Sequence, residues 1–302
     1  MANIIPAELK RDVILSSAMR AFKQRILPVL AFATAFRNVP LQGTNKILVP
    51  YYPLETGGST DYNGAYAIGN TSEVQTKEVT VNKRKYQSLS FTSDEWNRQP
   101  YLDIEKIAML KGEKLAQDVL DDIFSVVTAV NYPGTTIAAV AANSFDLDNV
   151  LELRRLCSED DWPMGGRSLL LDSGHAEYLL KDSRLGLANA GSTAPLREGG
   201  FGGRIAGFDP YEVPRLPDNA ENLVGMAVFP SSIFIAFSPI RPAPAVRHTL
   251  AQYELVTDPD SQLAIEYRLW GEPGTDKQME VIECNYGYAV GEPAALKRIA
   301  SA

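Results

Sequence analysis

The order of the segments along this 302-residue chain constrains its fold more than any single motif does. A short basic segment comes first, then a long polar stretch of β-type sequence, then a long amphipathic stretch without proline at 104–129, and finally a region rich in Gly and Pro. A short arm and a polar excursion bury little surface on their own, so we expect both to be held by neighbouring molecules. The order indicates a subunit of an assembly rather than a self-contained enzyme.

The charge is distributed unevenly along the chain. The first 50 residues hold seven basic and two acidic residues, which gives them a net charge of +5. The net charge of the whole chain is −8, so the remaining residues have a net charge of −13. A basic arm of this kind can pair with a neighbouring copy, face an anionic polymer such as packaged nucleic acid, or form an ordinary solvated face of a helix. The arm residues that we predict at contacts between subunits are Arg20, Lys23 and Arg25.

Two observations exclude other classes of protein. Cys157 and Cys284 are the only cysteines, which excludes a disulfide scaffold and a cysteine-rich zinc site and fits two reduced, buried side chains. Charged residues and Pro28 interrupt the apolar stretch at 13–36, so it is neither a signal sequence nor a membrane span. We therefore expect no membrane association.

The polar stretch predicts a long β-hairpin. A short strand at 47–49 and a longer alternating run at 74–91 are joined by a tip rich in Gly, Ser, Thr, Asn and Tyr. A hairpin that is polar on both faces is marginal in water, so packing against another subunit is expected. Its predicted contact residues are Tyr62, Tyr66, Lys77, Lys83, Arg84 and Lys85. The three at 83–85 can equally be gatekeepers against incorrect strand pairing.

Three helices are predicted with definite ends. The spacing of apolar residues at 7–27 is helical and stops at Pro28. The stretch 104–129 follows Asp103 as N-cap and carries one apolar stripe over about seven turns, at 3.6 residues each. The third helix, at 145–159, is capped by Ser144 or Asp146.

The second half of the chain predicts mixed α/β structure, so the fold class is α+β. A buried strand at 168–171 precedes a helix at 173–182, and three apolar runs at 204–213, 223–229 and 231–237 fit a small sheet. Two long strands follow, at 253–269 and 277–290, as a hairpin.

The candidate catalytic motifs are weak. Ser173 and His175 are close in sequence, but the Gly-x-Ser-x-Gly pattern is absent, and Ser173 fits better as a helix N-cap. A serine hydrolase that uses Ser173 and His175 remains the alternative from another class. The run Gly199, Gly200, Gly202 and Gly203 lacks both the Walker and the dinucleotide-binding patterns, which favours a flexible loop. The sequence predicts no catalytic residue, cofactor or metal ion.

The whole layout resembles the major capsid proteins of tailed bacteriophages, with the Hong Kong 97 type of fold. Two local matches support the resemblance. Gly203 to Val213, GRIAGFDPYEV, is similar to the family's strand pair after the axial loop, and Tyr288 to Leu296, YAVGEPAAL, is similar to its C-terminal strand and Pro-Ala finish. The resemblance implies an N-terminal arm at 1–45, an extended β-hairpin loop at 46–100 and a peripheral domain with its spine helix at 101–145. The axial domain would then follow at 146–250, with its glycine-rich loop, and peripheral strands and the C-terminus at 251–302.

By the same resemblance, the expected function is that of a shell subunit without enzymatic activity. Hexamers and pentamers would tile an icosahedral shell around double-stranded phage DNA, which the protein would contact without sequence specificity. The implied partners are a portal, a cement protein and a separate scaffolding protein, since the arm begins close to Met1. The implied location is the virion, after assembly in the host cytoplasm. An encapsulin-like protein compartment with the same fold is the nearest alternative.

Overall fold

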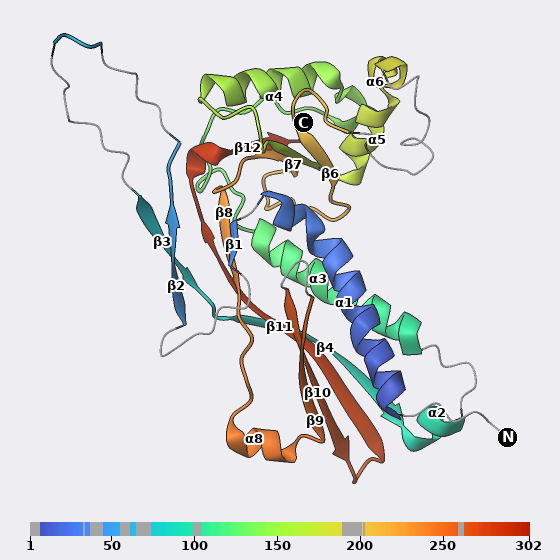
Figure 1. The fold of residues 1–302 in the computed structure, drawn as a ribbon. Helices are drawn as coiled ribbons and strands as arrows, with labels where there is room; N and C mark the ends of the chain where they lie inside the picture. The colour runs from blue at the N-terminus through green and yellow to red at the C-terminus, as the bar shows by residue number, and fades with distance from the viewer. Residues whose placement is uncertain are drawn as a thin grey trace.

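The computed structural model describes residues 7–32, 34–36, 45–54, 61–64, 74–98, 104–188, 201, 203–258 and 263–302. The molecule is elongated: a long sheet and two long helices form one end, a smaller α/β unit forms the other, and a narrow two-stranded ribbon stands off the side (Figure 1). The fold class is α+β, as predicted. Within these ranges, none of the helices combines the length and the apolar character that crossing a membrane requires.

The two long helices α1 (Ala7–Phe32) and α3 (Ile104–Phe124) pack against each other. One face of α1 is fully buried, in a row made of Ile14, Leu15, Ala18, Met19, Phe22, Ile26 and Val29. The expectation that the N-terminal segment buries little surface of its own is therefore wrong for α1, because this row belongs to the main hydrophobic core. The helix also continues through Pro28, where the prediction ended it. Burial of Ile26 and Val29 beside it offsets the hydrogen bond that proline removes.

Helix α3 follows its predicted stripe but ends at Phe124 instead of residue 129. The side chain of Asn219 donates hydrogen bonds to the carbonyls of Phe124 and Val127, at 2.9 and 2.8 Å. The Glu221 carboxylate accepts from the backbone N–H of Ala129. These side chains stabilise a turn after the helix, and a partner about 90 residues away cannot be read from local periodicity.

The two helices lie very close together at Gly112 of α3. A Cβ atom placed there would lie 2.3 Å from the carbonyl oxygen of Ala18 and 2.8 Å from its Cα. Substitution Gly112→Ala should therefore destabilise the protein by about 1–3 kcal/mol through overpacking. In an uncrowded helix the same change would stabilise it by about 1 kcal/mol. Urea denaturation measures the sign of the change in the free energy of unfolding. A Gly112→Ala variant that is more stable than the wild type would contradict this close contact.

The long sheet has six strands in the order β1–β8–β11–β10–β9, with β4 on the other side of β11. The strands are β1 (Thr34–Phe36), β4 (Lys83–Thr92), β8 (Ile233–Phe237), β9 (Gln252–Thr257), β10 (Ala264–Glu272) and β11 (Lys277–Val290). Two predictions need correction. The single strand expected at 253–269 is two antiparallel strands, β9 and β10, and β8 lies in this sheet instead of beside the run at 223–229. Alternation of apolar residues identifies a strand but not its partner.

The smaller unit is a four-stranded sheet in the order β12–β7–β5–β6. Its strands are β5 (Ser168–Leu171), β6 (Asp209–Glu212), β7 (Leu223–Val228) and β12 (Leu296–Ala300), and its helices are α4 (Leu147–Glu159), α5 (Ser173–Lys181) and α6 (Ser183–Ala188). Asp146 caps α4 in a capping box with Asn149, which decides between the two predicted caps. The C-terminal strand β12 pairs with β7, although 251–302 was assigned to the peripheral part. The division into domains stays a prediction.

The two-stranded ribbon consists of β2 (Lys46–Tyr51) and β3 (Gln75–Thr80) in antiparallel register. The predicted hairpin is thus present but shorter, since the run expected to continue to residue 91 leaves the ribbon after Thr80 and becomes β4 of the long sheet. The ribbon also has a core of its own at its base, which the sequence reading did not expect. Val49, Val79 and Val81 pack on Phe234 and Ala236 of β8.

Shorter elements complete the described chain. They are α2 (Ser93–Arg98), η1 (Ala142–Ser144), α8 (Pro244–Thr249) and η2 (Pro293–Ala295).

Candidate functional site

The predicted contact residues on α1 have partners within the chain. Lys23 forms an ion pair of 2.9 Å with Asp258, and the guanidinium of Arg25 donates two hydrogen bonds, of 2.9 and 2.6 Å, to the amide oxygen of Gln117. Arg20 is exposed and meets Glu105 at 3.5 Å. Part of the basic charge of this segment is therefore neutralised locally. An additional role of these side chains between subunits stays a prediction.

The basic residues at the start of β4 alternate between the two faces of the sheet. Lys83 donates to Asp122 of α3 at 2.9 Å and to the Tyr288 hydroxyl at 2.5 Å, while Lys85 donates to the Asp118 carbonyl at 2.6 Å. Burial would lower the pKa of Lys83, but the hydrogen bonds to Tyr288 and Asp122 outweigh it and raise that pKa. Arg84, on the opposite face, pairs with Glu283. Two of the three predicted contact residues here therefore bind α3 of the same chain.

The ribbon and the residues beyond it expose several apolar side chains in the described part of the chain. Leu48 on β2 and Tyr62 beyond it are exposed, and Tyr52 is 72 % exposed. Lys77 is exposed on β3. Tyr66 lies outside the described residues. Exposed aromatic side chains grouped on one projecting element are typical of an interaction surface.

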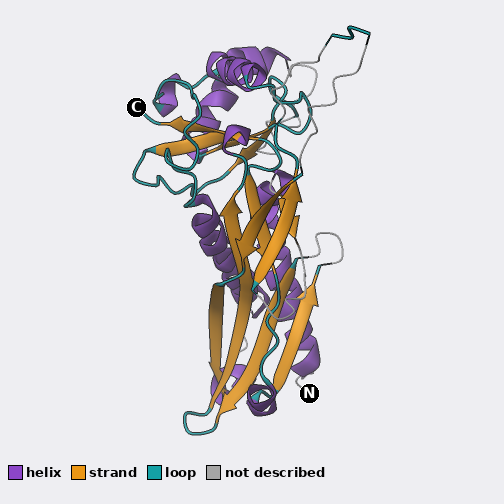
Figure 2. Ribbon diagram, turned by 90° about the vertical axis from the view of Figure 1, so that its left-hand side faces the viewer, coloured by secondary structure: helices purple, strands orange, loops and turns teal. Residues whose placement is uncertain are grey.

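A groove of 520 Å³ lies on the face of the long sheet that points away from α1 and α3. In Figure 2 the strands of this sheet stand in front of the two long helices. The groove is lined by Arg84, Tyr86, Ser88, Arg268, Trp270, Met279, Val281 and Glu283. Tyr86 is 62 % exposed. The solvent face of an antiparallel sheet is usually polar, so the apolar residues of this lining, Tyr86, Trp270, Met279 and Val281, indicate an interaction surface.

Buried charges lie beneath this groove. Glu266 and Glu283 are almost fully buried, and Arg268 between them forms ion pairs with both, at 3.3 and 2.6 Å. Glu266 also accepts hydrogen bonds from the backbone N–H of Ile240 and from Asn285, both at 2.6 Å. Burial and the charge of Glu283 raise the pKa of Glu266. The alternation of apolar and charged residues along β10 does not distinguish a solvated strand face from one that carries buried ion pairs.

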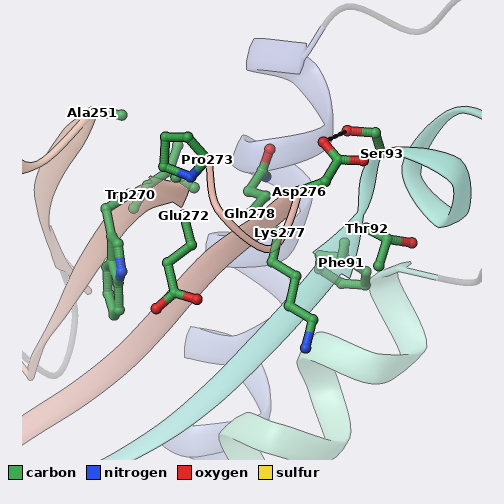
Figure 3. Close-up of a pocket in the computed structure, with 12 residues that line it drawn as sticks. Phe91, Thr92, Ser93, Ala251, Trp270, Glu272, Pro273, Asp276, Lys277 and Gln278 are labelled. Atoms are coloured by element: carbon green, nitrogen blue, oxygen red, sulfur yellow. Dashed lines mark hydrogen bonds between the residues drawn. The ribbon is translucent and has the colours of Figure 1, made fainter.

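A smaller hollow, of 350 Å³, lies at the far end of the long sheet, around the turn between β10 and β11. Figure 3 shows Trp270, Glu272 and Lys277 around it, with the Ser93 hydroxyl donating to Asp276 at 2.7 Å. In the described part of the chain, His, Cys, Asp and Glu side chains form no group of three or more that could hold a metal ion.

Most of the predicted glycine-rich loop lies outside the described residues. Gly199, Gly200 and Gly202 fall there, whereas Gly203 has a φ of +142° and open space around it. The chain then makes a tight turn, in which Ile205 and Phe208 pair across Ala206 and Gly207. Strand β6 follows directly.

The Ser173 and His175 side chains are not paired with each other. The Ser173 hydroxyl donates to the Glu212 carboxylate at 2.5 Å. The two ring nitrogens of His175 face Asp172, at 2.7 Å, and the Val140 carbonyl, at 3.1 Å. The N-cap of α5 is Asp172, which corrects the assignment of Ser173 to that position. In this arrangement the imidazole is not placed to accept the proton of the serine.

His175 joins the first turn of α5 to the segment around Val140, and its hydrogen bonds make the stability depend on pH. Both ring nitrogens face acceptors, so the protonated ring satisfies both. Burial lowers the pKa of His175, but the hydrogen bonds to Asp172 and Val140 outweigh it and raise that pKa. Its contribution to stability is fully present below the ordinary histidine pKa of about 6.5 and is lost as the pH rises through the higher pKa of the folded state.

We expect an NMR titration of the His175 ring to give a midpoint above about 6.5. The difference in free energy of unfolding between the wild type and His175→Asn should shrink as the pH rises through this midpoint. A midpoint at or below the ordinary value would contradict the role of Asp172 and Val140 as acceptors.

The comparisons with known proteins agree on the fold. The chain is similar to the capsid of cyanophage P-SCSP1u (12 % identity over 89 % of this chain and 86 % of that one, TM-score 0.57). It is also similar to the mature capsid of bacteriophage PhiM1 (10 % identity, 89 % and 85 % covered, TM-score 0.54). A third match is the virus-like particle from Pyrococcus furiosus (14 % identity, 97 % and 98 % covered, TM-score 0.56). No protein-family model matches the sequence, and neither does any curated protein.

The chain therefore has the tailed-phage capsid fold, which confirms the expectation drawn from the order of its segments.

Proposed function

We propose that this chain is the major capsid protein of a tailed bacteriophage, a structural shell subunit without enzymatic activity. The observation that carries the proposal is the likeness of fold to phage capsids over nearly nine tenths of the chain. The subunits would form hexamers and pentamers of a closed icosahedral shell, in which each copy offers the same surfaces to its neighbours. Portal, cement and separate scaffolding proteins, non-specific contact with packaged double-stranded DNA, and assembly in the host cytoplasm belong to the same proposal.

The contact that we propose between copies joins the tip of the ribbon on one subunit to the groove on the next. Residues 51–74 hold the acidic residues Glu55, Asp61 and Glu73 and no Lys or Arg. The charge that the groove exposes is that of Arg84, because its partner Glu283 is buried beneath it. Aromatic side chains are present on both surfaces, as is common at the centre of interfaces.

Tyr86→Ala should reduce the yield of shells without unfolding the subunit. The side chain is largely exposed, so its loss should change the free energy of unfolding by no more than about 0.5 kcal/mol. Removing an aromatic contact at an interface commonly costs about 2 kcal/mol or more in binding. Sedimentation of assembled and free protein measures the yield. Tyr178→Ala, which removes an exposed tyrosine of α5, is the matched control, and equal yields from all three proteins would exclude the groove as the contact.

The match to the Pyrococcus furiosus particle keeps a second function open, that of an encapsulin-like compartment. Negative-stain microscopy of the expressed protein tests both proposals, since each requires closed shells. Shells purified from cells that carry the rest of the phage genes would protect DNA from nuclease in the first case and hold a cargo protein in the second. A protein that stays monomeric at high concentration, with its candidate partners present, would exclude both.

A further inference from the structure

The end of β3, at the base of the ribbon, passes over strand β11 of the long sheet at Gly287. Gly287 lies within β11 and is the register partner of Ala236 on β8. A Cβ atom placed on Gly287 would lie 2.1 Å from the carbonyl oxygen of Thr80 and 2.8 Å from the Cα of Val81. A glycine inside a strand often marks the close approach of another backbone, and here that backbone is the end of β3.

The same side of the sheet holds the apolar base of the ribbon. Ala236 and Phe234 contact Val49 and Val79, and the backbone N–H of Val81 donates to the carbonyl of Asn45 at 2.8 Å. The ribbon therefore rests on this face of β8 and β11 from Val79 to Val81.

The chain is fixed again immediately after the crossing, on the opposite side of the sheet. Lys83 is the register partner of Tyr286, and its ammonium group binds Asp122 of α3 and the hydroxyl of Tyr288. The Tyr286 hydroxyl donates to the same oxygen of Asp122 at 2.8 Å. Burial would raise the pKa of Asp122, but the hydrogen bonds from Lys83 and Tyr286 lower it, which keeps this carboxylate charged. Lys83, three residues after Thr80, therefore holds the start of β4 against α3 through its side chain.

We propose that Gly287 and Lys83 are positioning residues that set the angle at which the ribbon leaves the body of the subunit. Gly287 lets the end of β3 lie directly on β11, and Lys83 holds the start of β4 against α3, so the two contacts fix the crossing from both faces. The angle decides where the tip of the ribbon reaches a neighbouring copy. This last consequence rests on the proposed function, whereas the angle itself is a property of the single subunit.

The close approach at Gly287 sets how far an alanine there would move the ribbon. Real Cβ atoms essentially never come within 3.0 Å of such a neighbour, so an alanine at Gly287 must push Thr80 away by roughly 1 Å. The atoms that it meets are backbone atoms, which cannot swing aside as the end of a flexible side chain can. Strand β3 extends roughly 20 Å from this point, at about 3.3 Å per residue, so a small rotation at its base becomes a larger displacement at its far end.

The test measures the ribbon in the unassembled subunit. Spin labels at Tyr52→Cys, beyond the end of β2, and at Val130→Cys, on the body, both replace strongly exposed residues. The native Cys157 and Cys284 are buried, so they should not react with the label. We expect Gly287→Ala to shift the mean distance between the labels by ~2 Å or more, given the length of the strand. We expect Lys83→Met to broaden the distance distribution, because one of the two contacts is lost.

Two control variants make the test specific. Gly274→Ala adds a methyl group in open space in the turn between β10 and β11, and Lys114→Met removes an exposed ion pair with Asp118 on α3. Both should leave the distance distribution of the wild type unchanged. If Gly287→Ala does not fold, Lys83→Met still decides the role of the second contact, because the Lys83 side chain is partly exposed and its loss should be tolerated.

The results separate this inference from the proposed function. Unchanged distributions in both Gly287→Ala and Lys83→Met would overturn the inference, whether or not the protein forms shells. A shifted ribbon in a protein that never assembles would support the inference and count against the proposed function. A shifted ribbon together with shells of altered diameter, or none, would support both.

Discussion

A chain in which Asn-Gly replaces residues 52–74 is expected to fold normally and to form no shells. Tyr51 and Gln75 are register partners at the end of the ribbon, so a two-residue turn of type I′ can join β2 directly to β3. The base of the ribbon keeps its contacts with β8, because Val49, Val79 and Val81 remain. The replacement removes the exposed Tyr52 and Tyr62 and all the acidic residues of the tip.

Thermal unfolding should match that of the full chain, and electron microscopy and sedimentation should show free subunits or small oligomers. A second variant, with a Gly-Ser segment of the original length, separates the effect of length from that of the side chains. Closed shells of ordinary diameter from the shortened chain would refute the role of the ribbon in assembly.

Phe22→Ala is expected to cost about 3–5 kcal/mol of stability, because it removes a large, fully buried aromatic side chain from the core between α1 and α3. This loss is a large part of the 5–15 kcal/mol that stabilises an ordinary domain. Leu27→Ala on the exposed side of the same helix should change the free energy of unfolding by about 0.5 kcal/mol or less.

Urea denaturation of both variants, followed by circular dichroism, measures this difference. If α1 is part of the core, Phe22→Ala lowers the midpoint of one cooperative transition. An unchanged main transition, with only a small loss of helical signal, would instead mean that α1 is a detachable arm, as the sequence first indicated.

The elements set by local interactions were predictable from the sequence. The stripe on α3 follows from spacing within one or two turns and agrees with the structure apart from the end of the helix. The N-cap of α4 was predicted as Ser144 or Asp146, and the structure shows Asp146. The positions of most strands were also predictable, because alternation of apolar residues and turn residues at the strand ends are local patterns. The order of the segments also pointed to the correct fold.

Partners distant in sequence were not predictable. Strand β8 pairs with β11 and β1, and β12 pairs with β7, and no alternation pattern contains this information. The burial of α1 was missed because its basic residues were assigned to neighbouring subunits, whereas Lys23 and Arg25 bind Asp258 and Gln117 of the same chain.

The groove was missed for a different reason. Its lining comes from three strands, so it exists only after β4, β10 and β11 have come together. The buried Glu266 and Glu283 beneath it look like solvent-facing residues in the sequence, because the ion pairs with Arg268 that make their burial tolerable are a tertiary property.

The position of β12 has a consequence for the timing of synthesis. This strand pairs with β7, and β8, β9, β10 and β11 of the long sheet lie between the two in the sequence. Its Leu296 and Ile299 are buried. The four-stranded sheet therefore cannot close on a ribosome until most of the long sheet has been synthesised. Folding that depends on such distant pairing is slow compared with folding by local contacts.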